Sequence, residues 1–307
     1  MNNLELTPDL FEKLDLADSS DAAFVRPSKS YWQDAWIRFR RDPLATAGLV
    51  TLFLIAALAI FGPVFSHYTY DGQDIASQNQ WPSMLHWFGT DKFGRDIFIR
   101  TLYGARISLS IGFVTAIINF FIGTIYGGIA GYFGGRIDMV MMSIVDFLIG
   151  IPSLLYIILI MMFLGNTLQS ILLALCLTYW TGTARMVRSQ VLSLKNQEFA
   201  LAAQAIGSSD LRILFRHLIP NSMGPIIVTI SFLIPTAIFS EAFLSFLGIG
   251  IQVPMASWGT LASEAIPSLF SYPYQMLIPT LAISITMFAL NFIGDGLRDA
   301  LDPRLKK

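Results

Sequence analysis

The chain contains few charged residues, one cysteine and three histidines, and each scarcity excludes a class of protein. Only 13% of its 307 residues are charged, about half the fraction usual in a soluble domain. The single cysteine, Cys176, excludes an internal disulfide. His67, His86 and His217 are scattered outside any cluster of ligand residues, so we predict no metal site. A GxxxxGK[ST] phosphate-binding loop is also missing, so we expect no ATP hydrolysis and no catalytic residue in this chain.

Hydrophobic residues are abundant instead, at 54% of the chain. A net charge of −1 gives no general basicity that would indicate a nucleic acid partner. The composition therefore predicts an all-α membrane protein with several spans.

Six apolar segments are each close to the roughly 20 residues that a spanning helix needs. Their flanks contain most of the polar residues, as expected for spans joined by loops. The predicted transmembrane helices cover residues 44–65, 107–132, 139–164, 168–186, 223–247 and 276–293.

The lysines and arginines predict the orientation of these helices. All of them except Lys92, Arg95, Arg100 and Arg106 lie in the two terminal segments, in the second and fourth loops, or at the adjoining helix ends. Positive residues concentrate on the cytoplasmic side, so both termini are predicted to be inside. The cytoplasmic segments are then 1–30, 31–43, 196–220 and 294–307, and the extracytoplasmic loops are 66–106 and 248–275.

The N-terminal region divides into two parts. Residues 1–30 are acidic and aperiodic, which predicts a flexible tail. Residues 31–43 predict a short amphipathic helix at the membrane interface, either as an ordinary anchor, which we favour, or as a specific lipid site. The residues on its face are Trp32, Trp36 and Phe39, with Arg38, Arg40 and Arg41 beside them.

The cytoplasmic segment 196–220 is the largest amphipathic stretch between spans. Gly207 is suited to the left-handed conformation that ends a helix, and Ser208 is then the expected N-cap of a second helix, with Asp210 in its first turn. Pro220 interrupts helical hydrogen bonding before the fifth span. These features predict a helical hairpin that another protein could contact, or a loop that merely folds back on itself. The expected apolar faces contain Phe199, Ala202, Ala203 and Ile206 in the first helix, and Leu211, Leu214, Phe215 and Leu218 in the second.

This hairpin resembles the EAA loop of permeases from ATP-binding-cassette (ABC) importers. The family pattern is Glu-Ala-Ala, three residues, Gly, nine residues and Ile-x-Leu-Pro. The chain has Leu201-Ala202-Ala203, then Gly207, then His217-Leu218-Ile219-Pro220 at the same spacing. Leu201 replaces the usual glutamate, and Glu198, one turn earlier, could supply part of its charge.

Further segments resemble the dipeptide and oligopeptide permeases. They are similar in the same order along the chain, and the long first outside loop and the N-terminal extension are similar to the C-type subunit of oligopeptide systems. The segments are 86–109, HWFGTDKFGRDIFIRTLYGARISL; 241–250, EAFLSFLGIG; Ser257-Trp258-Gly259; and 291–304, NFIGDGLRDALDPR.

The resemblance implies a type I importer permease in the bacterial cytoplasmic membrane. Its implied partners are a second, homologous permease subunit, two cytoplasmic ATPases that hold ATP and magnesium, and an extracellular substrate-binding lipoprotein. The hairpin would be the coupling element that an ATPase moves. The implied coupling residues are Glu198, Ala202, Ala203, Ile206, Gly207, Ser208, Asp210 and Leu211.

Polar and small residues within the spans indicate two further features. Asp146 and Glu241 are ionisable groups at membrane depth, so we expect them to face the translocation path or the subunit seam, or else to form internal hydrogen bonds. A ridge of small residues predicts close helix packing, against another span of this chain in preference to the second permease. The ridge consists of Gly123, Gly127, Gly131 and Gly135.

Several alternatives remain at this stage. Permeases of this type transport oligopeptides, dipeptides, nickel chelates and other small solutes, and we favour oligopeptides. An ion-coupled secondary carrier would usually show inverted repeats and broken-helix ion sites, and the sequence has no convincing repeat. The aromatic residues of the 66–106 loop predict either a cap or dock for the binding protein, or interfacial anchoring, and the 248–275 loop is predicted to be re-entrant or lid-like.

Overall fold

The computed structural model describes residues 30–252 and 254–302. The predicted tail over 1–30, apart from Ser30, and the last part of the predicted 294–307 segment lie outside these residues. The regular secondary structure of the described part is helical, and its one β-type pairing is an isolated bridge between Thr90 and Asp96. The prediction of an all-α protein is therefore confirmed.

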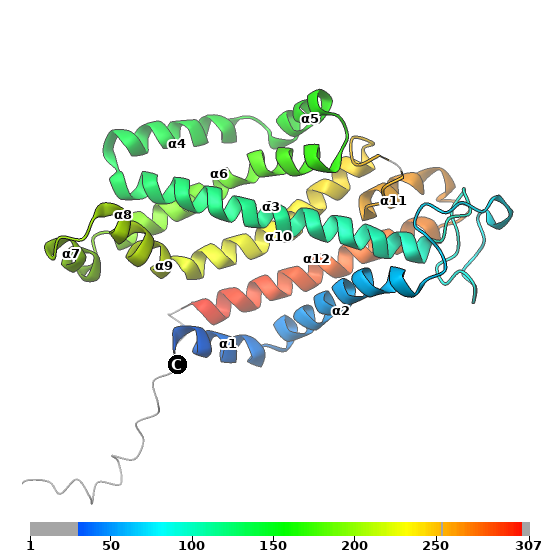
Figure 1. The fold of residues 1–307 in the computed structure, drawn as a ribbon, viewed down its shortest axis with the longest axis horizontal. Helices are drawn as coiled ribbons and strands as arrows, with labels where there is room; N and C mark the ends of the chain where they lie inside the picture. The colour runs from blue at the N-terminus through cyan, green and yellow to red at the C-terminus, as the bar shows by residue number, and fades with distance from the viewer. Residues whose placement is uncertain (1–29, 253, 303–307) are drawn as a thin grey trace, which may run out of the picture.

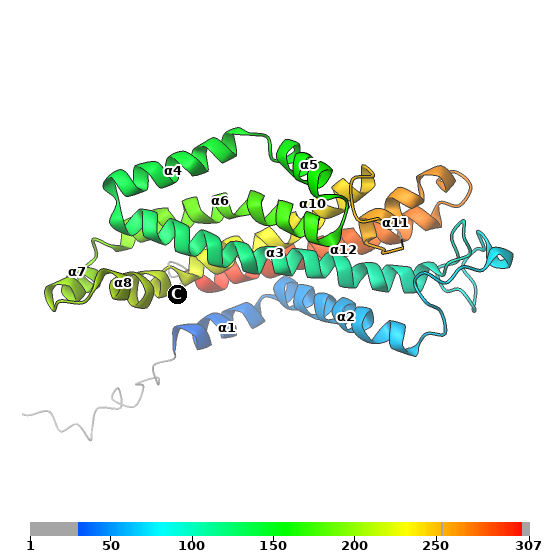
Figure 2. The same ribbon diagram turned by 45° about the horizontal axis from the view of Figure 1, so that its top comes forward.

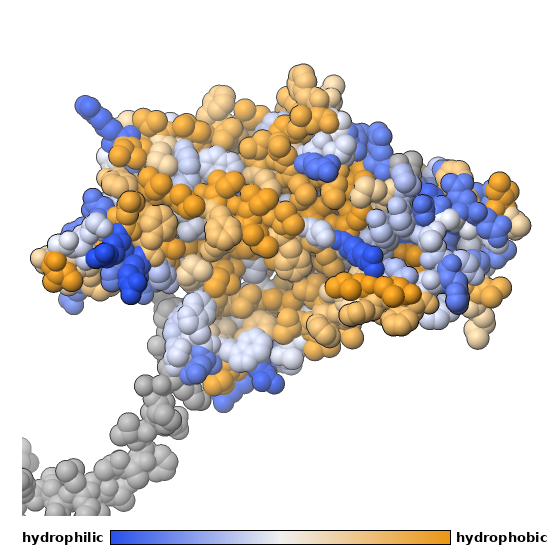
Figure 3. All heavy atoms as spheres, viewed as in Figure 1, coloured by the Kyte–Doolittle hydropathy of each residue, from blue (hydrophilic) through white to orange (hydrophobic). Residues whose placement is uncertain are grey.

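Five helices are long and apolar enough to cross a membrane, and a bent helix pair supplies a sixth candidate span. They run nearly side by side along the long axis (Figure 1). Hydrophobic residues cover the middle of the face in Figure 3, and hydrophilic residues gather at its two ends, as expected for a bilayer-spanning bundle. The five helices are α2 Pro43–Phe65, α3 Ile97–Phe133, α6 Leu168–Leu194, α10 Met223–Phe246 and α12 Tyr274–Leu301, and the bent pair is α4 Gly135–Gly150 with α5 Ser153–Leu164.

Three spans are longer than the apolar runs that predicted them. Helix α3 begins at Ile97 instead of residue 107, because Asp96 caps it by accepting a hydrogen bond from the Ile99 amide at 2.9 Å and because carboxylates neutralise Arg100. Helices α6 and α12 continue beyond the predicted ends at 186 and 293. Hydrophobicity therefore located the membrane-crossing part, but helical hydrogen bonding continues into the polar ends.

The predicted span 139–164 is two helices, α4 and α5, whose axes differ by 85°. The break lies at Ile151 and Pro152, which separate Gly150 from α5. Proline cannot donate a backbone hydrogen bond, and it favours extended backbone in the preceding residue. Ile151 has this extended conformation, with φ −92° and ψ 128°. Figure 2 shows α4 and α5 on one side of α3 and α6, and α1 and α2 on the other.

The glycine ridge packs α3 against α6 of the same chain, as the favoured alternative predicts. A Cβ atom at Gly123 would lie 2.5 Å from the Cβ of Thr183, and one at Gly131 would lie 2.8 Å from the carbonyl oxygen of Arg188. Gly127 is equally close to the backbone of Ala184. Any side chain at these positions would push the two helices apart.

Gly135 does not belong to this ridge, and that part of the prediction is wrong. A Cβ atom at Gly135 would have no neighbour within 4 Å. Its φ of +54° and the φ of +66° at Gly134 turn the chain from α3 into α4. The spacing of one glycine every four residues continues past the end of α3, where the glycine allows the chain to turn and makes no close contact between helices.

Arg106 explains how a charged side chain fits among apolar helices. Pro63 has no amide hydrogen, so the Ala59 carbonyl in α2 lacks its usual helical partner. The guanidinium of Arg106 donates to this carbonyl through Nε, and to the Ile60 carbonyl through Nη2 at 2.7 Å. The arginine therefore satisfies a backbone group that the proline left free.

The two terminal helices meet at one end of the bundle. The amphipathic helix α1 (Tyr31–Arg41) lies beside the last turn of α12, where the Tyr31 hydroxyl donates to the Leu301 carbonyl at 2.8 Å. The hairpin after α6 lies at the same end, and the loop after α2 lies at the other (Figure 1). This arrangement is the one that a protein with both termini inside requires.

Candidate functional site

The cytoplasmic hairpin follows α6 and projects from one end of the bundle (Figure 1). It begins with a helix of two turns and returns toward α10 through three short helical segments. These elements are α7 Glu198–Ala205, α8 Asp210–Ile213, the π-helical turn Leu214–Leu218 and α9 Ile219–Asn221.

The bend at the tip is a helix-ending motif built on Gly207. This residue has φ +79°, and its amide donates to the Gln204 carbonyl at 2.9 Å. The Ser208 amide donates to the Ala203 carbonyl at 3.0 Å, which completes a Schellman motif. The predicted glycine bend is therefore present. The N-cap of the second helix, however, is Ser209 and not Ser208, because Ser208 is still part of the motif that ends α7.

Pro220 shapes the returning segment. It has no amide hydrogen for the Arg216 carbonyl, and the turn just before it is widened. The Ile219 amide donates to the Leu214 carbonyl, five residues back, which is the π-helical pattern.

The inner face of the hairpin is an apolar core shared with the ends of α3 and α6. Ala200 and Ala203 of α7 face this core, instead of the predicted pair Ala202 and Ile206. Of the predicted face, Ala203 lies in the core and Phe199 packs against it, whereas Ala202 and Ile206 are exposed. The buried members of the core are Tyr132, Val187, Val191, Ala200, Ala203, Ile213, Leu214, Leu218, Ile219 and Ile226.

Two polar contacts join the hairpin region to the last turn of α3. The Tyr132 hydroxyl donates to Asp210 Oδ1 at 2.7 Å, and Lys195 Nζ donates to the Tyr132 carbonyl at 3.0 Å. Asp210 was predicted as a helix-start residue, but Tyr132 and Lys195 were not predicted, since no local pattern links them to the hairpin. These two contacts attach the hairpin region directly to the end of α3.

The outer face of the tip is apolar and exposed. Ile206 is 83% exposed, Leu211 59% and Leu201 49%. We call these three residues the apolar tip. They lie outside the bilayer-spanning segments, and the exposed charged residues Glu198, Arg212 and Arg216 surround them in the hairpin sequence. Exposed apolar side chains outside the membrane, with charged residues near them, are typical of a protein-binding site.

The predicted coupling residues occupy different parts of this hairpin. Ala203 is buried in the core, Ser208 is half-buried, and Asp210 binds Tyr132. The remaining predicted residues are exposed: Glu198, Ala202, Ile206, Gly207 and Leu211. Five of the eight predicted residues are therefore on the surface of the hairpin, and their role in coupling stays a prediction.

Asp146 lies on an exposed part of α4 and forms an ion pair with Arg185 of α6. Arg185 Nη2 lies 2.6 Å from Asp146 Oδ1, and the two side chains are 52% and 63% exposed. An ion pair that faces lipid is costly, and the predicted place of Asp146 at the path or the subunit seam stays a prediction. Arg185 was not predicted, because it lies at the end of the apolar run and only the tertiary fold brings it to Asp146.

The surroundings of Glu241 fit the second of its two predicted roles, which is internal hydrogen bonding and not a place on the translocation path. Its side chain is fully buried. The carboxylate accepts hydrogen bonds from Ser108 Oγ at 3.1 Å and Ser245 Oγ at 2.7 Å. Ser108 also lies 3.4 Å from the Trp258 amide, so this network joins α3, α10 and the short helix α11 (Trp258–Glu264).

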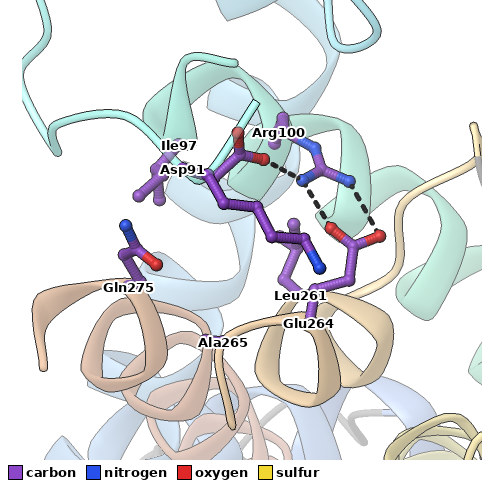
Figure 4. Close-up of a pocket in the computed structure, with 8 residues that line it drawn as sticks. Asp91, Ile97, Arg100, Leu261, Glu264, Ala265 and Gln275 are labelled. Atoms are coloured by element: carbon purple, nitrogen blue, oxygen red, sulfur yellow. Dashed lines mark hydrogen bonds and ion pairs between the residues drawn. The ribbon is translucent and has the colours of Figure 1, made fainter. Parts of the chain in front are cut away.

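The opposite end of the bundle contains a cluster of largely buried charges, which we call the ionic clasp, and Figure 4 shows three of its members, Asp91, Arg100 and Glu264. It consists of Asp91, Arg95, Arg100 and Glu264. Arg100 Nη1 lies 2.7 Å from Asp91 and 2.8 Å from Glu264, and Arg95 lies 2.6 Å from Asp91 and 2.5 Å from Glu264. Two positive and two negative groups thus compensate one another and join the first outside loop to α11.

The cavity beside the ionic clasp is too small for a transported solute. It encloses about 20 Å³, enough for roughly one water molecule. Helix α11 is also fixed to α3 by the buried Trp258, whose Nε1 donates to the Thr101 carbonyl at 3.0 Å. This part of the predicted lid-like loop 248–275 is therefore firmly attached, and the clasp is structural.

The first outside loop exposes some of its aromatic residues. Trp81 is 58% exposed and Trp87 64%, whereas the ring of Phe88 lies 5.0 Å from that of Phe98 in α3. Across residues 30–252 and 254–302, no group of three or more His, Cys, Asp or Glu side chains could hold a metal ion.

Comparison with known proteins places this architecture among transport proteins. Residues 123–307 match the family model described as the inner membrane component of binding-protein-dependent transport systems, and residues 30–82 match that of the N-terminal transmembrane domain of oligopeptide transport permease C. The chain is 50% identical over 292 residues to the oligopeptide transport system permease protein OppC of Bacillus subtilis, covering 95% of this chain and 96% of that protein.

Two further relatives are similar over most of their length. The dipeptide transport system permease protein DppC of Bacillus subtilis is 50% identical over 283 residues, which cover 92% of this chain and 88% of that protein. OppC of Escherichia coli K12 is 44% identical over 278 residues, covering 90% and 92%.

Proposed function

This chain belongs to the family of inner membrane components of binding-protein-dependent transport systems, and from that membership we propose that it is a pore subunit of an ABC importer for oligopeptides. It is a multi-pass protein of the bacterial cell membrane and acts as a permease component together with other subunits. In this proposal the chain supplies the membrane path and no catalytic group, and ATP and magnesium bind in the partner ATPases.

The observation that carries the proposal is the apolar tip on a firmly attached hairpin. Ile206 is 83% exposed, although the turn that carries it is held by the buried core below. We place this tip in a cleft of one ATPase. The charged rim of Glu198, Arg212 and Arg216 would orient it there, and Leu201 makes an apolar contact where the family often has a glutamate.

Transport then follows from two states of one assembly. Closure of the two ATPases on ATP displaces the hairpin, and the hairpin displaces the ends of α3 and α6, to which its core is packed. ATP binding at the ATPases and substrate binding in the membrane path both shift the same equilibrium between the two states, so ATP binding and substrate release are coupled. Asp210 and Tyr132, 2.7 Å apart, belong to this connection.

The remaining partners are assigned to the exposed surfaces. We place a second homologous permease against the α4 side of the bundle, where Asp146 and Arg185 would face the seam or the path. The extracellular binding lipoprotein would dock on the first outside loop, near Trp81 and Trp87.

Oligopeptides are the proposed substrate because the N-terminal match is to an oligopeptide permease domain and the 50% identical relative is an oligopeptide permease. A dipeptide permease is equally identical, so dipeptides are the second candidate. Competition of a labelled pentapeptide by unlabelled dipeptides and pentapeptides, in vesicles with the complete importer, distinguishes the two. Equal competition by dipeptides would favour the second candidate.

The coupling role is tested with Ile206→Asp. A carboxylate at the centre of the apolar tip should abolish copurification of the ATPases and peptide uptake, because burying an unpaired charge in the contact is costly. Phe270→Asp is the matched control, since Phe270 is 98% exposed at the opposite end. Normal copurification and uptake with Ile206→Asp, at unchanged membrane abundance, would contradict the role of the tip.

A further inference from the structure

One face of α1 presents a stripe of aromatic and basic side chains to the outside. Trp32, Trp36 and Arg40 are spaced four residues apart and so lie on one face of the helix. Trp32 is 51% exposed and Trp36 52%, and Arg40 and Arg41 are exposed as well. The Arg40 guanidinium lies 5.9 Å from the centre of the Trp36 ring, so a cationic group and an aromatic ring are held together.

The opposite face of α1 holds the helix in place. Phe39, which was predicted on the face of the two tryptophans, lies here instead: it is 4% exposed and packs with Ala45 of α2 and Ala300 of α12, and Ala35 beside it is 5% exposed. Helix α1 is therefore a firmly seated part of the bundle, and the direction of its outer stripe is set by the fold.

The basic residues of α1 differ in whether they have a partner. Arg38 lies 2.9 Å from Asp34 and also donates to the Asp302 carbonyl at 3.3 Å. Neither Arg40 nor Arg41 forms an ion pair with any residue in the part of the chain that the structure describes. Among the described residues, these two exposed positive charges therefore have no carboxylate partner.

The place of the stripe indicates what covers it. Helix α2 follows α1 directly and exposes large apolar side chains, with Val50 52% and Phe53 70% exposed, as a lipid-facing helix does. Helix α1 lies where this surface ends on the cytoplasmic side. Tryptophan rings prefer the headgroup level of a bilayer, and arginine binds phosphate through two parallel hydrogen bonds.

We propose that Trp32, Trp36, Arg40 and Arg41 form a binding surface for anionic phospholipid headgroups of the cytoplasmic leaflet. The tryptophans lie among the glycerol and upper acyl groups, and the two arginines bind the phosphates. This surface belongs to the permease alone and needs no ATPase or transported solute, so it stands independently of the proposed function.

The test uses the purified full-length chain in mild detergent. Short-chain phosphatidylglycerol and phosphatidylcholine are titrated separately, and bound lipid is counted by native mass spectrometry. We expect tighter binding of phosphatidylglycerol, weakened about fivefold by each of Arg40→Gln and Arg41→Gln, because each basic residue near an anionic surface contributes by about this factor. Arg40→Lys with Arg41→Lys should retain most of the binding, since the charge remains.

The matched control is Arg212→Gln with Arg216→Gln, which removes two exposed arginines from the hairpin at the same end. It should leave phosphatidylglycerol binding unchanged. Equal affinity for the two lipids, or equal loss in the control, would overturn the proposal. So would selective binding that emerges only after deletion of residues 2–29, because the acidic tail would then be the occupant of the stripe.

Discussion

The hairpin at one end of α3 and the ionic clasp at the other are attached to that helix by different interactions, apolar packing in the first case and ion pairs in the second. Around Tyr132 the attachment is an apolar core with two polar links. Around Arg100, which is 1% exposed, it is four compensating charges. Apolar packing has no fixed direction, so it can be rearranged slightly without leaving a group unsatisfied. A buried ion cluster cannot open without leaving a charge unpaired.

The two ends of α3 therefore differ in how rigidly they are attached. The clasp makes the outside loop, α3 and α11 one unit, and the hairpin gives the same helix an attachment that tolerates movement. Both ends of α3 are thus fixed by the fold, and the proposed coupling places the displacement at the cytoplasmic end.

The largest effect is expected from opening the clasp. Arg100→Met leaves the carboxylates of Asp91 and Glu264 with Arg95 alone, and should lower the free energy of unfolding by about 3–5 kcal/mol. Thermal unfolding of the purified chain in detergent measures this. Arg185→Met is the matched control, because its ion pair is more than half exposed and should contribute less than about 1 kcal/mol. Equal losses in the two variants would remove the contrast between buried and exposed charge.

The second effect tests the apolar attachment of the hairpin. Leu214 is fully buried, and Leu214→Ala should cost about 2–4 kcal/mol through the cavity it creates. Hydrogen exchange should then become faster across residues 198–221 and remain unchanged around the clasp. Leu211→Ala, at a 59% exposed position, should change neither stability nor exchange by a measurable amount. Uniformly faster exchange would mean that the two ends are not independent.

The third effect tests the bend. Gly207 has φ +79°, so Gly207→Ala should cost about 1–2 kcal/mol locally. Gly207→Asn should cost less, because asparagine adopts this conformation more readily. Peptide-stimulated ATPase activity of the complete importer should fall more with alanine than with asparagine. Gly207→Pro should uncouple transport altogether while leaving the chain inserted, and identical activity in the three variants would exclude a role for the bend.

The smallest effect tests the polar link. Tyr132→Phe removes the hydrogen bond to Asp210 and should cost about 1 kcal/mol. Tyr126→Phe is a control of the same chemistry, since Tyr126 donates to the Met141 carbonyl away from the hairpin. Transport should be reduced by the first change only. A larger effect of Tyr126→Phe would place the coupling at α4 instead.

Local sequence was sufficient for the features that depend on neighbouring residues. Apolar runs located the spans, because each must satisfy its own backbone hydrogen bonds inside a bilayer. Gly207 and Pro220 predicted the bend and the interruption after it, because both act through their own backbone. The same reasoning failed at Gly135, because α3 ends before it, and at the Ser208 cap, because the motif that ends α7 extends to Ser208.

Folding of the whole chain was needed to pair the charges. Arg95 and Glu264 are 169 residues apart in sequence, and Arg185 and Asp146 are 39 apart. No periodicity relates such residues, so the sequence could mark Asp146 and Glu241 as unusual without saying that one is exposed and the other buried. The composition and order of the segments therefore predict the class of protein, whereas the partner of each ionisable group follows from the packing of distant helices, because that packing alone sets the distances on which electrostatic interaction depends.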